Sequence, residues 1–172
     1  IALFDHEEVG SQSSQGAGGP MLEHVLERLS VAAGSSRSDY LLSLQKSHCV
    51  SADNAHAVHP NYVDRHELNN APLINEGVVV KTNVSQRYAT SPLSLVPIVH
   101  AAATAGVNLQ TFSSRNNIAC GSTIGPITAT RIGIETVDIG VPQLSMHSIR
   151  EMCGTKDPVD LVALLSAYFS RS

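Results

Sequence analysis

The amino-acid sequence predicts an α/β domain, in which helices cover a largely buried sheet. Short apolar runs typical of strands alternate with longer segments whose apolar residues recur at helical spacing. The chain has 172 residues, of which 42% are hydrophobic and 15% charged, so it is long enough for one domain with a hydrophobic core.

The first half of the chain is expected to contain three strands and one helix. Residues 1–4 suit a short buried strand that ends at the acidic group 5–8. A loop rich in Gly and Ser follows, and a proline then opens an amphipathic helix over residues 20–34. The apolar runs at residues 48–52 and 78–80 suit the next two strands.

The second half is expected to contain two further helices and two further strands. Ser91 caps a helix that ends near Gly106. Residues 109–112 and 134–139 suit strands, with the Gly-rich segment "CGSTIGP" between them. The final helix opens at residues 157–158, and its inward-facing stripe is expected to consist of Val162, Leu165 and Phe169.

Charge and cysteine content exclude several classes of function. A net charge of -4 and a pI near 6.0 give no general attraction to nucleic acid or to anionic membranes. The three cysteines are far apart and form no C-x-x-C pair, so neither a disulfide framework nor a thiolate zinc site is expected. No apolar run in the sequence is long enough to cross a bilayer, and we expect a cytoplasmic protein.

The acidic group "DHEE" is the first candidate for chemistry. It places three carboxylates and an imidazole at the end of an apolar run, and a metal ion is the strongest compensation for such crowded negative charge. In an extended segment Glu7 and Glu8 point in different directions, so one could hold a metal while the other faces a metal-bound water. The alternative is a solvated acidic turn.

Two later segments offer further ligands. Asp53 ends an apolar strand in "SADNAHAVHPNY", and His56 and His59 follow it at three-residue intervals. Asp53 is the better ligand candidate, because a loop histidine more often makes ordinary hydrogen bonds. His147 lies in the polar segment "QLSMHSIRE", where the alternative is again a surface histidine.

Five motifs together resemble the aspartyl aminopeptidase family. "FDHEEVGS", "SADNAHAVHPNY", "VVVKTNVSQRYAT", "CGSTIGP" and "PQLSMHSIREM" occur in the family's order across nearly the whole chain. The resemblance implies a zinc-exopeptidase-like mixed sheet flanked by helices and a centre of two zinc ions. It also implies release of N-terminal Asp or Glu from peptides, and assembly into homo-oligomers that are dodecamers in the family.

The resemblance assigns roles to the acidic and imidazole side chains. Glu7 matches the general base that takes a proton from zinc-bound water. Glu8 and His147 match ligands of one zinc, and Asp53 matches a ligand of the other.

Substrate-binding residues follow from the same resemblance. Lys81 matches the position that meets the acidic side chain of the substrate, and Tyr88 lies in the same segment. His59 matches a histidine that reaches the active site of a neighbouring subunit. Asn117 and Ala119 depart from the family's usual Asp and Pro.

The family's remaining zinc ligands, a His and a bridging Asp, lie upstream of the acidic motif. Residues 1–172 are therefore expected to be the C-terminal portion of a metallo-aminopeptidase catalytic domain, without the N-terminal portion and the dimerisation domain. Such a chain is expected to be inactive alone. The alternative function is that of a non-catalytic assembly or scaffold fragment.

Overall fold

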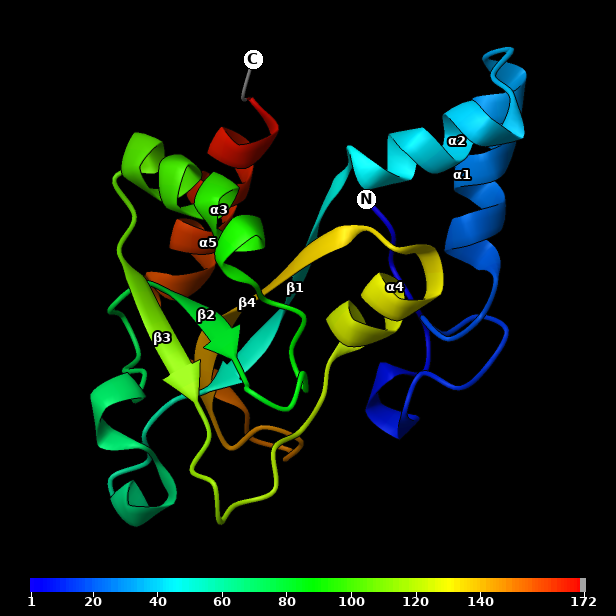
Figure 1. The fold of residues 1–172 in the computed structure, drawn as a ribbon. Coiled ribbons are helices and arrows are strands. Elements are labelled where there is room, and N and C mark those ends of the chain that lie inside the picture. The colour runs from blue at the N-terminus through cyan, green and yellow to red at the C-terminus, as the bar shows by residue number, and fades with distance from the viewer. Residues whose placement is uncertain (171–172) are drawn as a thin grey trace.

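A computed structural model describes residues 1–170 and shows a mixed sheet flanked by helices (Figure 1). Within these residues the sheet has the strand order β1-β4-β2-β3, and β5 pairs with β4. β4 is parallel to β1 and antiparallel to β2, whereas β2 and β3 are parallel. The strands are β1 (His48–His56), β2 (Val78–Thr82), β3 (Leu109–Ser113), β4 (Glu135–Leu144) and β5 (Met152–Cys153).

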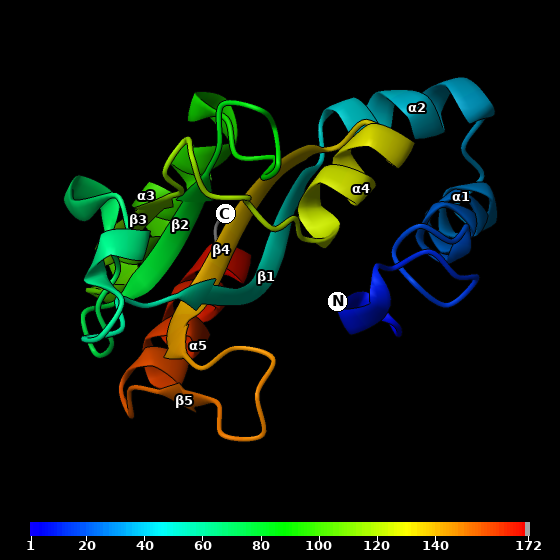
Figure 2. The same cartoon turned by 90° about the horizontal axis from the view of Figure 1, so that it is seen from below.

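Helices cover both faces of this sheet. α3 and α5 pack against each other and enclose the main core with β2 and β4, through residues such as Val80, Ile98, Ile139 and Leu164. α4 lies on the opposite face against β1 and β4, and α1 and α2 extend to one side of the sheet (Figures 1 and 2). The helices are α1 (Met21–Ala32), α2 (Arg37–Gln45), α3 (Pro92–Ala105), α4 (Ile124–Ile132) and α5 (Asp157–Phe169).

The α/β prediction is confirmed, and four of the five expected strands form. Each of the four is longer than its expected range. Mostly polar residues extend β1, β2 and β3, whereas β4 continues through residues 140–144 because these pair with β1 and β5. The helix expected after Ser91 begins there with a reciprocal capping box between Ser91 and Ser94. It ends at Gly106, whose φ of 68° lies in the left-handed region.

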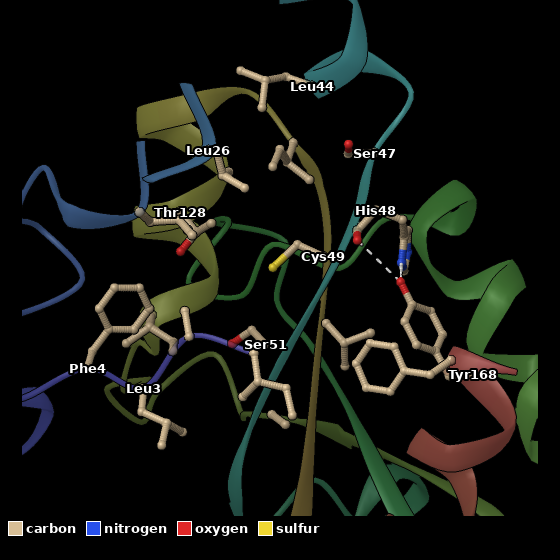
Figure 3. A pocket seen from close by; sticks show the side chains of 18 of the residues that line it. Leu3, Phe4, Leu26, Leu44, Ser47, His48, Cys49, Ser51, Thr128 and Tyr168 are labelled. Carbon is tan, nitrogen blue, oxygen red and sulfur yellow. Dashed lines mark hydrogen bonds between the residues drawn. The ribbon is translucent and has the colours of Figure 1, made fainter. Parts of the chain in front are cut away.

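The strand expected over residues 1–4 does not form. Ile1 and Leu3 are exposed, and these residues make no ladder with β1. A cavity of about 720 Å³ lies beside β1 instead, lined by residues 1–4 and by side chains of α4 and α5 (Figure 3). A strand requires a neighbour for its backbone groups, and an apolar run alone does not supply one.

α2 and α4 were not expected from the sequence. α4 begins inside the Gly-rich "CGSTIGP" segment, which was expected to lie between two strands without a helix. Pro126 lies in the first turn of α4, where its missing N–H breaks no helical hydrogen bond. α2 carries little periodic apolar pattern, but a capping box between Ser36 and Asp39 defines its start.

The inward stripe of α5 differs from the prediction. Val162 and Phe169 are 65% and 66% exposed, whereas Leu164 is fully buried and Leu165 packs partly against the core. The buried face instead runs through Asp157, Leu164 and Tyr168, because α5 is rotated to pack on α3 as well as on the sheet. Sequence periodicity alone could not choose between these two adjacent faces.

We predict that Leu164→Ala lowers the free energy of unfolding by about 2–5 kcal/mol, because it removes a buried side chain and leaves a cavity. Val162→Ala, on the exposed face of the same helix, should change it by less than about 0.5 kcal/mol. Denaturant titration of both variants measures the difference. Equal losses of unfolding free energy in the two variants would contradict the burial of Leu164 and the exposure of Val162.

Candidate active site

Asp53 and Lys81 meet on the face of the sheet that α4 covers. Asp53 lies on β1 and Lys81 on β2, and the Lys81 Nζ donates to Asp53 Oδ2 at 3.2 Å and to the Asn54 carbonyl at 2.9 Å. In the ladder register Gly140 of β4 pairs with Asp53 of β1 and with Val79 of β2. A Cβ there would come within 2.8 Å of the Asp53–Asn54 backbone, so this close approach requires glycine.

Lys81 is deeply buried, although its side chain carries a charge. Its side chain is 2% exposed and that of Asp53 is 34% exposed. The Nζ also lies 5.4 Å from the centre of the Tyr88 ring, a favourable cation–π distance. Burial raises the pKa of the Tyr88 hydroxyl, with the nearby Cys120 as the next cause, so Tyr88 remains a neutral phenol.

Glu8 and His147 form a second pair at the mouth of the site. The His147 Nε2 lies 3.1 Å from Glu8 Oε2, and both side chains are well exposed. The two residues come from opposite ends of the chain. Glu8 lies in a short 3-10 turn, Glu7–Val9, rather than in the extended segment that the sequence suggested.

Backbone strain accompanies this pair. His6, next to Glu7, has φ 61°, and His147 has φ 66°. Residues other than glycine seldom adopt this region, and they do so where the surrounding structure holds them there. His6 and His147 lie in the two turns that carry Glu8 and His147, and positive φ also occurs at Ser11, Asn75, Gln86 and Ser145.

Glu7 links the two pairs electrostatically. Partial burial raises the pKa of its carboxyl group, and the negative charges of Asp53 and Glu8 raise it further. His147 and Lys81 act in the opposite direction. A carboxyl group with a raised pKa is better suited to accept and return a proton near neutral pH.

Six of the seven predicted site residues line one cavity of about 140 Å³, namely Glu7, Glu8, Asp53, Lys81, Tyr88 and His147. His59 does not line it. It lines an adjoining cavity of about 470 Å³, which shares His56, Tyr88, Gly121 and Met146 with the first. The His59 Nδ1 accepts a hydrogen bond from the Asn61 N–H at 3.1 Å.

Sequence reasoning missed two contributors to this site. The Glu151 carboxylate accepts the backbone N–H of His147 at 2.8 Å and so helps to hold the strained turn. Its position four residues after His147 was a signal that the sequence offered. The Asn54 carbonyl, which accepts from Lys81, carried no such signal, because any residue supplies a carbonyl.

The donor types suit a zinc ion, but the number of gathered donors is small. Carboxylate oxygens and imidazole nitrogens are ordinary zinc ligands. Across residues 1–170, no three His, Cys, Asp or Glu side chains converge in a way that could hold a metal. The described chain therefore supplies suitable donors without a complete set of ligands.

The carboxylates and the imidazole around this cavity are the ligand types that metal-dependent hydrolases use. A family model for the aminopeptidase I zinc metalloproteases, M18, matches residues 1–169. The chain belongs to this M18 family. The resemblance seen in its five motifs is thereby confirmed.

Curated relatives are similar over nearly the whole chain. A probable M18 family aminopeptidase 2 of Pseudomonas savastanoi pv. phaseolicola is 49% identical over 99% of the chain, which spans 39% of that relative. A probable aspartyl aminopeptidase of Ricinus communis is 51% identical over 91% of the chain and 32% of its own length. The chain thus spans less than half the length of these relatives.

Solved structures share the fold. The chain matches one from the cryo-EM structure of the Ape4 and Nbr1 complex with a TM-score of 0.91 at 48% identity, covering 96% of this chain and 31% of that one. It matches the S. cerevisiae mApe1 dodecamer with a TM-score of 0.85 at 32% identity, covering 98% and 37%. The expected zinc-exopeptidase-like sheet is confirmed by these matches.

In the described part of the chain, no helix has the length and apolar character needed to cross a bilayer.

The partly buried His66, in the adjoining cavity, should make stability depend on pH. Burial lowers the pKa of its imidazole, so near and below the ordinary histidine pKa the folded protein binds fewer protons than the unfolded chain. Stability should therefore fall as pH decreases from about 7.5 to about 5.5. His66→Gln should reduce this slope of melting temperature against pH, whereas His24→Gln, at an exposed position on α1, should not. If melting temperature depends on pH equally in both variants, His66 is not the source of the pH dependence.

Proposed function

We propose that residues 1–172 form part of a zinc-dependent aminopeptidase that releases N-terminal Asp or Glu from peptides. The observation that carries this proposal is the convergence of Glu7, Glu8, Asp53, Lys81 and His147 at one cavity. Membership of the M18 family supports the reaction class. The name of the Ricinus communis relative supports the acidic specificity.

The metal ligands of this chain would fall into two groups. Glu8 and His147 would hold one zinc ion. The 3.1 Å distance between their polar atoms supports binding to the same ion. Asp53 would hold the second ion. When bound, zinc polarises the scissile carbonyl and makes a bound water more acidic.

Glu7 would act as the general base and then as the general acid in this reaction. Its carboxylate would accept a proton from the attacking water and return it to the amine of the departing peptide. The raised pKa of Glu7 supports this role, because the group must be both a base and an acid within one turnover.

Lys81 would recognise the acidic side chain of the substrate. An ammonium group has three donors, and the two contacts to Asp53 and Asn54 use two of them. The third would meet the substrate carboxylate in a desolvated setting, where a charge-assisted hydrogen bond is strong. Tyr88, whose ring lies beneath the ammonium, would form the wall of this pocket.

The chain would be the C-terminal portion of the catalytic domain, with the N-terminal portion and the dimerisation domain in other parts of the polypeptide. The outer edge of β1 and the apolar cavity beside it offer a place for further strands of such a domain. The incomplete set of ligands in the described residues agrees with this division. Turnover by the 172-residue chain alone, at verified purity, would contradict it.

His59 would act between subunits of a homo-oligomer. It lines the adjoining cavity rather than the one that holds the other six site residues, and the related mApe1 is a dodecamer. Hybrids formed by exchange between a His59→Ala and a Glu7→Gln enzyme should then regain activity. Proven mixing without rescue would exclude this arrangement.

We predict that Glu7→Gln, in the protein that carries this chain, lowers kcat by about 10²-fold or more, because the base is lost. Zinc content, measured by elemental analysis, should stay nearly unchanged. Glu8→Gln is the matched variant and should lower zinc content. The reverse pattern would mean that the two glutamates have exchanged roles, and activity that survives complete chelation would exclude the metal mechanism.

We predict that Lys81→Met narrows the preference for aspartyl over asparaginyl substrates by roughly tenfold to a hundredfold, mainly by slowing the acidic substrates. Because Lys81 also holds Asp53, zinc content must be measured in the same samples. If the preference for aspartyl over asparaginyl substrates stays unchanged, Lys81 does not bind the substrate side chain and only pairs with Asp53. The acidic specificity would then arise elsewhere.

A further inference from the structure

Asp138 is a fully buried carboxylate that the proposed reaction does not use. It lies on the central strand β4, on the face that α4 covers, and its exposure is 0%. In the described chain no Lys or Arg lies within salt-bridge distance of it. Its oxygens instead accept two short hydrogen bonds, from the Thr123 hydroxyl and the Ala89 N–H, each at 2.6 Å.

The start of α4 provides the rest of the compensation. Thr123 is the N-cap of α4, and the positive end of the helix dipole therefore faces the carboxylate. Gly125, in the first turn, is so close that a Cβ there would lie 2.2 Å from Asp138 Oδ1. The carboxylate is thus fitted between β4 and the first turn of α4.

The two segments that Asp138 holds are two walls of the candidate active-site cavity. Tyr88, which is next to Ala89, and the segment 121–123 both line the cavity. Direct contacts also join them, because Arg87 Nε donates to the Cys120 carbonyl at 3.2 Å and the Ser122 hydroxyl donates to the Arg87 carbonyl at 3.1 Å.

We propose that Asp138 is a positioning residue that fixes the separation between Tyr88 and the segment 121–123, and so fixes the shape of the substrate pocket before the substrate binds. The inference rests on the proposed function and deepens it, since it names the residue that holds two lining segments of the substrate pocket in place. In a cavity of about 140 Å³, a small displacement of either wall changes what fits.

Asp138→Asn tests this directly. Asparagine keeps the shape but replaces one acceptor by a donor, so the two hydrogen bonds can no longer both be accepted by a charged group. We expect kcat/KM for an aspartyl peptide to fall about tenfold or more, mainly through a higher KM, with zinc content unchanged. Hydrogen exchange in segments 87–90 and 120–123 should become about tenfold faster, while exchange in β4 stays slow.

Asp157→Asn is the matched control. Asp157 is also fully buried and accepts the backbone N–H groups of Asn75 and Gly154, but it lies at the start of α5 and does not line the cavity. Its loss should lower the melting temperature without changing KM or exchange in segments 87–90 and 120–123.

Two further variants keep the test informative if Asp138→Asn does not fold. Thr123→Val removes one donor isosterically, and Gly125→Ala adds a methyl group against the carboxylate; both should reproduce the local exchange pattern. Unchanged exchange in both segments, or a KM no different from that of Asp157→Asn, would overturn the proposal. If the unaltered protein releases no N-terminal residue, the proposed function fails, and the exchange measurements still decide whether Asp138 joins the two walls.

Discussion

The site depends on the burial of the Lys81 ammonium within the sheet. A buried ammonium needs an anion and further acceptors, and Asp53 and the Asn54 carbonyl supply them from across β4. This contact requires β4 to lie between β1 and β2. It also requires Gly140 where β4 closely approaches the Asp53–Asn54 backbone. Strand order, register and the identity of one glycine are therefore tied to a single ion pair.

The sequence predicted which residues gather around one cavity better than it predicted their geometry. Glu7, Glu8, Asp53 and His147 were recognised because their residue types sit in distinctive motifs, and the structure brings all four to one cavity. The turn that carries Glu7 and Glu8 was expected to be extended, because the left-handed conformation of His6 has no signature in the sequence. The pairing of Glu8 with His147 joins residues far apart in the chain, and only the fold brings them together.

The errors in the predicted fold have the same origin, because a local sequence pattern carries no information about long-range packing. Residues 1–4 have the composition of a buried strand, yet no neighbour pairs with them and their side chains border a cavity beside β1. In α5, Val162 and Leu164 are equally apolar, and only contact with α3 and the sheet decides which one is buried. Where a local rule was sufficient, as in the capping box of Ser91 and the terminal Gly106, the prediction held.

The same face of the sheet carries two buried charges that are compensated in different ways. Lys81 is neutralised by an opposite charge, whereas Asp138 is stabilised by a hydroxyl, a backbone N–H and the start of α4. Lys81 and Asp138 themselves lie on strands and are buried, while Glu8 and His147 lie in exposed turns at the opening of the site. In the proposed reaction zinc and substrate would contact Asp53 and Lys81 directly, whereas the carboxylate of Asp138 has its partners within the protein.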